Sequence, residues 1–325
     1  MAISKISIAA RGIAMGIAEV IPGVSGGTIA FITGIYERLI NSIKSFGPIA
    51  LKAFKEEGVK GFWKSIDGNF LTALAAGMVI GIVIGIFGIT YLLDNYPEPL
   101  WGFFFGLIVA SAVYIARQIE QWNVKLVGAL IIGAIIAYCI TVLSPAEGST
   151  HPLYVFVSGV LAISALMLPG ISGSFILLLL GMYTLVIPAL KNLLSSFDTG
   201  SLLIVVIFGS GCIVGLAGFS RILSWLFAKY KDISLALLTG FIIGALNKVW
   251  PWRNVSKILD KESGETLEVM DLSNFSALNP DNYKILKEVN CLPNDYLMGE
   301  PLTILTIFCI FAGLISVFML GKYGE

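Results

Sequence analysis

"EVIPGVSGGTIAFITGIY", residues 19–36, decides how this chain folds. The stretch holds one proline and four glycines, yet the sequence on either side is apolar enough for membrane helices. Proline and glycine both interrupt helices. Irregular backbone survives at membrane depth only where protein or a water-filled cavity covers it. The stretch therefore predicts a helix that breaks inside a protein-covered part of the membrane.

The composition is that of an integral membrane protein. Of the 325 residues, 57% are hydrophobic and only 13% are charged, and the mean hydropathy is +0.88. Soluble domains carry about a quarter charged residues, and several apolar runs here reach the roughly 20 residues that cross a bilayer as a helix. Basic and acidic residues balance at 21 each, so the net charge gives no signal for nucleic acid, and no nucleic-acid partner is expected.

Metal-ligating residues are sparse and scattered. The four cysteines lie far apart, no pair has the spacing of metal ligands, and His151 is the only histidine of the sequence. Metal sites need several such residues at short, defined spacings. We therefore expect neither a metal nor a cofactor, and we interpret the cysteines as ordinary small core residues.

The opening stretch recurs as "LMLPGISGSFILLLLGMY", residues 166–183. A shift of 147 residues superposes identical residues, including the pairs Pro22 and Pro169, Gly23 and Gly170, Ser25 and Ser172, Gly26 and Gly173, Gly34 and Gly181, Tyr36 and Tyr183. A second shift, of 134 residues, aligns Gly77 with Gly211, Gly81 with Gly215, Tyr96 with Tyr230, and Gly106 with Gly240. This self-similarity predicts an internal repeat.

We therefore predict a single membrane domain over residues 1–325, built from two similar halves. Its parts are repeat 1 at 11–117 (hairpin 12–42, spans 68–93 and 100–117), a connecting span at 124–143, repeat 2 at 152–249 (hairpin 152–190, spans 200–227 and 233–249), a polar loop at 250–300 and a final span at 302–321. The basic, aromatic stretch 44–68 predicts either an amphipathic helix on the membrane surface or a plain cytoplasmic loop.

Basic residues predict the orientation, because cytoplasmic loops are rich in Lys and Arg. Segment 37–66 has six of them, 117–125 and 229–232 have two each, and 94–99 and 144–151 have none. This alternation places both termini in the cytoplasm and the 250–300 loop outside. The two motifs must then each enter and leave the membrane on one side, from opposite faces. The predicted fold is an all-α polytopic membrane protein with an inverted-topology repeat and two re-entrant helical hairpins, a plan common in transporters.

The motif chemistry favours an anion. A new helix is expected to begin near Ser25 and near Ser172, and a helix N-terminus presents unpaired N–H groups and partial positive charge. The predicted hairpin breaks are Pro22, Gly23, Pro169 and Gly170, and the predicted phosphate-binding residues are Ser25, Gly26, Gly27, Thr28, Ser172, Gly173 and Ser174. The alternative is that the serines only cap their helices and that the small residues ease helix packing.

Charged residues at membrane depth are costly and usually functional. Glu19 lies three residues before Pro22, and Arg11 and Arg38 flank the same hairpin. Arg221 lies within the 200–227 span. We interpret Glu19, with Arg11, as the coupling residues of an ion- or proton-coupled carrier. Arg38 and Arg221 are candidates for phosphate contacts. Snorkelling to the interface is the alternative for Arg11, Arg38 and Arg221, and a charge that only sets the orientation is a further alternative for Arg11.

The sequence resembles the polyprenyl-phosphate transporter family. Its members carry R-G-x-x-M-G-x-A-[DE]-x-x-P-G-V-S-G-G-T near the start and P-G-x-S-G-S midway. The first motif is matched from Arg11 to Thr28 and the second from Pro169 to Ser174. The resemblance extends to about residue 249 and implies a flippase of the bacterial inner membrane that returns undecaprenyl phosphate to the cytoplasmic leaflet. The expected partners are then a polyprenyl phosphate and membrane lipid, and a homo-oligomer is compatible with the pattern.

Two other functions fit parts of the pattern. Undecaprenyl-pyrophosphate phosphatases also pair two re-entrant hairpins, but they use P-G-x-S-R-S, whose arginine is replaced here by Gly26 and Gly173. Phosphoryl transfer also needs an acidic pair, and Glu19 has no acidic residue one turn away. A small-anion channel or exchanger is the other alternative, because opposed helix N-termini also suit chloride. We expect a carrier and not an enzyme.

Overall fold

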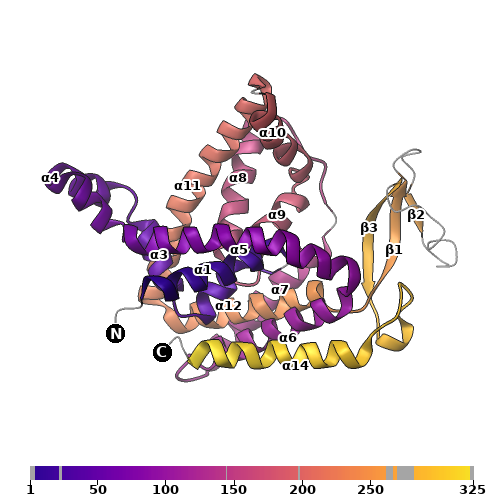
Figure 1. The fold of residues 1–325 in the computed structure, drawn as a ribbon. Helices are drawn as coiled ribbons and strands as arrows, with labels where there is room; N and C mark the ends of the chain where they lie inside the picture. Colours follow the sequence, from indigo (N-terminus) through magenta and orange to yellow (C-terminus); the bar gives the residue numbers. More distant parts are fainter. Residues whose placement is uncertain are drawn as a thin grey trace.

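A computed structural model describes residues 4–21, 24–143, 145–196, 198–260, 266–268 and 282–322. Most of the chain is helical (Figure 1). The helices are α1 (Lys5–Val20), α2 (Gly26–Ile32), α3 (Tyr36–Lys44), α4 (Pro48–Ser65), α5 (Gly68–Asn95), α6 (Pro97–Ala116), α7 (Val124–Val142), α8 (Pro152–Met167), α9 (Gly173–Leu179), α10 (Tyr183–Ser196), α11 (Thr199–Lys229), α12 (Lys231–Ala245) and α14 (Thr303–Lys322). The described residues also form the 3-10 turns η1 (Leu246–Val249) and η3 (Pro293–Asp295) and the strands β1 (Arg253–Asp260), β2 (Thr266–Glu268) and β3 (Tyr283–Asn290).

The long helices have the length and composition of membrane spans. Among the described residues, five pass this test: α5, α6, α7, α11, and α12 with η1. The bent pair α9–α10 would make a sixth if counted as one span. Large apolar side chains such as Phe87, Ile213 and Phe308 are exposed on these helices and on α14, as expected for surfaces that face lipid. The chain is a multi-pass membrane protein.

Corresponding glycines bring corresponding helices together. A Cβ added to Gly77 on α5 would lie 2.1 Å from the carbonyl oxygen of Ala9 on α1. One added to Gly211 on α11 would lie 2.1 Å from the carbonyl oxygen of Phe156 on α8. Small residues permit such close backbone approach between membrane helices. The α1–α5 and α8–α11 pairs are therefore built alike, at the positions that the repeat aligns.

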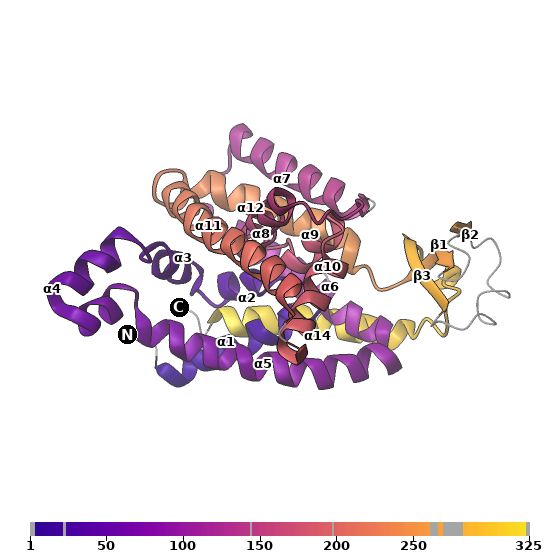
Figure 2. The same ribbon diagram turned by 90° about the horizontal axis from the view of Figure 1, so that it is seen from above.

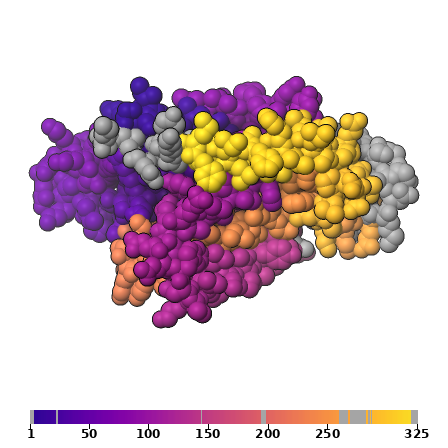
Figure 3. Space-filling view, turned by 90° about the horizontal axis from the view of Figure 1, so that it is seen from below, coloured from indigo at the N-terminus to yellow at the C-terminus, as the bar shows by residue number. Residues whose placement is uncertain are grey.

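The last helix of each repeat packs on one of the two helices that lie outside the repeats. Gly106 on α6 lies against Ile310 on α14, and Gly240 on α12 lies against Leu130 on α7. Figure 3 shows α14, in yellow, lying along one face of the molecule beside the magenta helices. Because α12 leads into the sheet and α14 leads away from it, the two pairs run in opposite directions (Figure 1).

A small β-sheet stands at one end of the molecule, and α4 stands at the other (Figures 1 and 2). The sheet is antiparallel, in the order β2-β1-β3, and Ile258 pairs with Leu267 on one side and Ile285 on the other. This sheet corrects the prediction of an all-α protein. Because β1 has a bulge near Lys257, its buried residues Val255 and Ile258 are three positions apart and not two. The sequence of β1 therefore lacks the period-two pattern that marks a strand.

The sheet is fastened to the helical body by aromatic side chains. The indole Nε1 of Trp252 donates to the carbonyl oxygen of Pro301 at 2.8 Å. The Tyr296 hydroxyl donates to Oε1 of the buried Glu98 in the first turn of α6. Burial of the Tyr296 phenol and the neighbouring Glu98 carboxylate raise the pKa of Tyr296 above its ordinary value. The 250–300 segment is therefore docked against the helices where the structure describes it.

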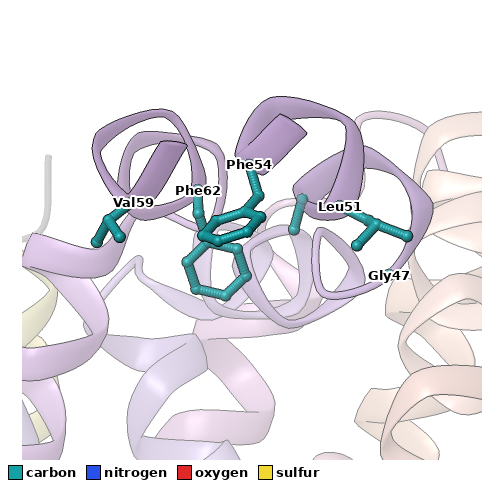
Figure 4. Close-up of a pocket in the computed structure, with 6 residues that line it drawn as sticks. Gly47, Leu51, Phe54, Val59 and Phe62 are labelled. Atoms are coloured by element: carbon teal, nitrogen blue, oxygen red, sulfur yellow. The ribbon is translucent and has the colours of Figure 1, made fainter. Parts of the chain in front are cut away.

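The stretch 44–68 forms α4, whose two arms meet at Gly58 (φ 66°). The arms enclose an open groove of about 330 Å³, lined by Gly47, Ala50, Leu51, Phe54, Val59 and Phe62. Figure 4 shows Phe54 and Phe62 lying against each other between the arms; their ring centroids are 6.4 Å apart. The segment is thus helical, with exposed apolar residues beside its lysines.

Candidate functional site

The first break lies between the end of α1 at Val20 and the start of α2 at Gly26. Pro22 and Gly23, predicted as the break itself, lie outside the described residues. Oε1 of Glu19 accepts a hydrogen bond from the Gly26 N–H at 2.8 Å. A Cβ at position 26 would lie 2.5 Å from this oxygen, so a side chain there would displace the carboxylate from its present position. The first amide of α2 is therefore engaged by an acidic side chain.

Serine completes this capping. Oγ of Ser25 accepts a hydrogen bond from the Gly27 N–H at 3.1 Å, and the Thr28 N–H donates to the Ser25 carbonyl oxygen at 3.0 Å. Ser25 is the N-cap residue of α2, in extended backbone conformation. The capping role that was the alternative prediction for Ser25 is therefore present in the structure.

The second break lies between the end of α8 at Met167 and the start of α9 at Gly173. Gly170 has φ +86°, a backbone conformation that favours glycine. Ser172 makes no side-chain capping bond to the described residues of α9; its hydroxyl instead shares a 2.8 Å hydrogen bond with the hydroxyl of Ser174. The residue in the place of Glu19 is Leu166. The second break therefore also lies between two helices, but it lacks the carboxylate.

The two breaks bond directly to each other. Oγ1 of Thr28 accepts a hydrogen bond from the Gly170 N–H at 3.0 Å. Oγ of Ser25 donates to the carbonyl oxygen of Leu168 at 3.3 Å. The Tyr36 hydroxyl donates to the carbonyl oxygen of Met167 at 2.8 Å. Motif residues that are more than 130 positions apart in the chain thus form one polar cluster.

This cluster is enclosed by protein. Ser25 and Thr28 are each 1% exposed, and Ser172 is 4% exposed. Buried polar groups are costly unless they are hydrogen-bonded, so the cross-break bonds both hold the halves together and compensate for burial. Ser174 is exposed, at the edge of the cluster. Sequence reasoning assigned no role to Tyr36, although its identity with Tyr183 in the repeat was a signal.

Two of the predicted arginines lie away from these hydrogen bonds. Nε of Arg38 on α3 pairs with Oδ2 of Asp67 at 2.7 Å, and its guanidinium lies 4.3 Å from the centre of the Phe70 ring. The guanidinium of Arg221 on α11 donates to the carbonyl oxygen of Phe46 at 3.2 Å. Arg38 therefore joins α3 to the start of α5, and Arg221 joins α11 to the turn that precedes α4.

The predicted coupling residues Arg11 and Glu19 share α1. Eight residues separate them, which corresponds to roughly 12 Å along a helix axis. The Glu19 side chain reaches the break, where it accepts the Gly26 N–H. Arg11 lies in the first half of α1.

Two broken helices whose breaks bond to each other inside an apolar helical body define a multi-pass membrane protein with a buried polar site between its halves. Residues 15–267 match the family described as undecaprenyl phosphate translocase-like, and the chain belongs to that family. The family predicted from the sequence motifs is thereby confirmed.

Two relatives with similar sequences support the same family assignment. The chain is 42% identical over 315 residues to a protein of Vibrio cholerae serotype O1 named polyprenyl-phosphate transporter, covering 97% of this chain and 96% of the relative. It is 32% identical over 255 residues to a polyprenyl-phosphate transporter of Staphylococcus aureus, covering 74% of this chain and 84% of that relative. No solved structure matches the chain.

Proposed function

We propose that this protein is a transporter that returns undecaprenyl phosphate, or a similar polyprenyl phosphate, from the outer to the inner leaflet of the bacterial cytoplasmic membrane. Family membership and the names of two relatives support the substrate class. The observation that carries the proposal is the direct bonding of the two buried breaks, through Thr28 and Gly170. A polar cluster enclosed in an apolar body suits a lipid whose phosphate must cross while its tail stays in the bilayer.

An inverted-topology repeat with two re-entrant hairpins is the arrangement that we propose for this chain. It is supported by the alike pairs α1–α5 and α8–α11 and by the opposite directions of α6–α14 and α12–α7. In the proposed orientation α4 and both termini face the cytoplasm, and the sheet faces outward. Alternating access would then come from movement of one half against the other.

The phosphate would bind between Ser25–Thr28 and Ser172–Ser174. In the described state the Glu19 carboxylate holds the Gly26 N–H, so a phosphate and this carboxylate compete for one donor. A proton on Glu19 would weaken its hold and favour phosphate, which couples proton movement to lipid movement. Arg38 and Arg221 would give charge-assisted contacts where the head group leaves on the cytoplasmic side.

A carrier fits the site better than a phosphatase. Glycine occupies positions 26 and 173, where phosphoryl transfer would need an arginine. At position 26 the side chain of Glu19 also fills the space that an arginine would enter. Release of inorganic phosphate from undecaprenyl pyrophosphate by the purified protein would establish an enzyme instead. An ionic current without polyprenyl phosphate would establish a channel.

The decisive experiment is a leaflet-resolved assay of undecaprenyl phosphate in liposomes that contain the protein. Replacing Ser25 and Ser172 together with alanine should slow transport roughly tenfold, because each lost hydrogen bond is worth about 0.5–1.5 kcal/mol. The variant should still fold, but its thermal unfolding midpoint should be lower than that of the wild type, because Ser25 also caps α2 and bonds to Leu168. A matched control replaces Ser210 and Ser316, whose hydroxyls bond only to carbonyls of their own helices in the described structure. Wild-type transport in the Ser25→Ala, Ser172→Ala variant would refute the phosphate site.

We also infer that the apolar groove of α4 rests on the cytoplasmic membrane surface. The exposed Leu51, Phe54 and Val59 suit the acyl boundary, and the neighbouring lysines suit anionic head groups. In a background whose native cysteines are serine, an environment-sensitive dye on Phe54→Cys should emit at shorter wavelength in liposomes than the same dye on Glu56→Cys. Equal emission from both positions would place α4 in water.

A further inference from the structure

A cationic cluster lies where the sheet meets the helices, outside the site described above. Oε2 of Glu288 on β3 pairs with a guanidinium nitrogen of Arg253 on β1 at 2.9 Å and with Nζ of Lys248 on η1 at 3.8 Å. Two cations therefore share one carboxylate oxygen. These three side chains, which we name the outer cluster, carry one net positive charge.

Aromatic rings hold the two cations in place. The guanidinium of Arg253 lies 4.7 Å from the centre of the Trp101 ring on α6. Nζ of Lys248 lies 5.6 Å from the centre of the Phe175 ring on α9. Contacts of this kind stabilise a cation more strongly when it is partly removed from water, and the Arg253 side chain is only 12% exposed. The cluster is thus a preorganised group and not a set of freely moving surface charges.

The outer cluster adjoins the second helix break. A small cavity of about 20 Å³ lies between them, and its lining is Ala137, Ile140, Thr141, Gly170, Ile171, Ser172, Phe175, Ala245 and Lys248. The cavity has room for roughly one water molecule, so a phosphate could enter only if neighbouring side chains moved aside. Lys248 therefore links the outer cluster to the Ser172 hydroxyl side of the break.

We propose that Lys248 and Arg253 form a receiving site for a phosphate monoester at the outer end, and that Glu288 occupies this site when it is empty. The inference rests on the transport function proposed above. A phosphate monoester carries up to two negative charges near neutral pH, so it neutralises the pair better than one carboxylate does. It would displace Glu288 and then pass along Lys248 to Ser172 and Ser174.

The surroundings favour a lipid head group over free phosphate. Trp101 lies against Arg253, and Trp250 and Trp252, whose rings are 5.8 Å apart, lie between Lys248 and Arg253 in the chain. Tryptophan concentrates at the level of lipid head groups. A phosphate attached to a prenyl chain would reach this depth while its tail remains among the exposed apolar side chains of the helices.

Neutralising Lys248 and neutralising Glu288 should change lipid binding in opposite directions. With the full chain in nanodiscs, Lys248→Gln should weaken binding of undecaprenyl phosphate about tenfold, because a charge-assisted hydrogen bond is lost. Glu288→Gln should tighten binding several-fold, because the competing carboxylate becomes neutral. A merely structural cluster would give weaker binding in both variants. The matched controls are Lys257→Gln and Glu268→Gln, an ion pair at 2.8 Å in the same sheet, which should leave binding unchanged.

The outcomes separate this inference from the proposed function. Unchanged binding in both Lys248→Gln and Glu288→Gln, or weakening in both, would overturn the receiving site even if wild-type transport is normal. Inorganic phosphate that competes as well as the lipid would overturn the lipid assignment, whereas weak competition by phosphate and none by undecaprenol supports it. Failure of the wild-type protein to move the lipid between leaflets would instead refute the transport function, whatever the binding results.

Discussion

A Gly170→Ala variant should lose most of its transport and unfold at a lower temperature than the wild-type protein. Gly170 has φ +86°, which costs an L-residue about 1–2 kcal/mol. A Cβ there would also lie 2.9 Å from the backbone of Ile242 on α12, and such overpacking costs about 1–3 kcal/mol more. Any shift that relieves the contact also moves the Gly170 N–H away from Oγ1 of Thr28. We expect transport to fall more than about tenfold, in line with the lost alignment of the two breaks.

Gly209→Ala is the matched control for this variant. Gly209 lies inside α11, and an added Cβ meets no heavy atom of the described residues within 4 Å. Alanine is favoured over glycine in helices by up to about 1 kcal/mol, so Gly209→Ala should unfold at the same temperature or higher and transport normally. Thermal unfolding in detergent and the leaflet assay measure both properties. A Gly170→Ala protein with wild-type stability and transport would show that the cross-break bond is dispensable.

Glu19→Gln should abolish the effect of a pH gradient on the distribution of the lipid. Glutamine retains an oxygen that can accept from the Gly26 N–H, so the break keeps its geometry while the titrating group is lost. If one proton moves with each lipid, a gradient of one pH unit contributes about 1.4 kcal/mol, enough for an about tenfold excess of lipid in one leaflet. The wild-type protein should build this excess in liposomes held at zero membrane potential. The Glu19→Gln protein should leave the lipid evenly distributed.

Glu120→Gln serves as the control, because Glu120 is exposed in the connection between α6 and α7. It should behave as the wild-type protein at every pH. The ratio of lipid between the two leaflets at equilibrium is the same for either orientation of the protein, so mixed insertion into the liposomes does not affect this measurement. A pH dependence in Glu19→Gln equal to that of the wild-type protein would exclude Glu19 as the coupling group and leave the substrate assignment intact.

The sequence by itself determined the features that depend on local chemistry. Apolar runs long enough to cross a bilayer marked the helices, because burial in lipid requires continuous hydrophobicity. Proline and glycine at matching positions in two halves marked the breaks, because these residues disfavour helix whatever surrounds them. The glycines that align at Gly77 and Gly211 predicted similar halves, and in the structure both lie at close helix contacts. The family motif rests on the same residues, so it was readable without a structure.

Only the tertiary structure decided which groups meet. Thr28 bonds to Gly170 across 142 residues, the Glu19 carboxylate takes the amide that was predicted to be open to phosphate, and Glu288 joins Lys248 to Arg253. No local pattern encodes such partners, because they depend on how distant segments pack and on a strand register altered by a bulge. Hydrophobic and helix-breaking patterns act within a few residues along the chain, whereas the charge and hydrogen-bond complement of a buried site is set by neighbours in space.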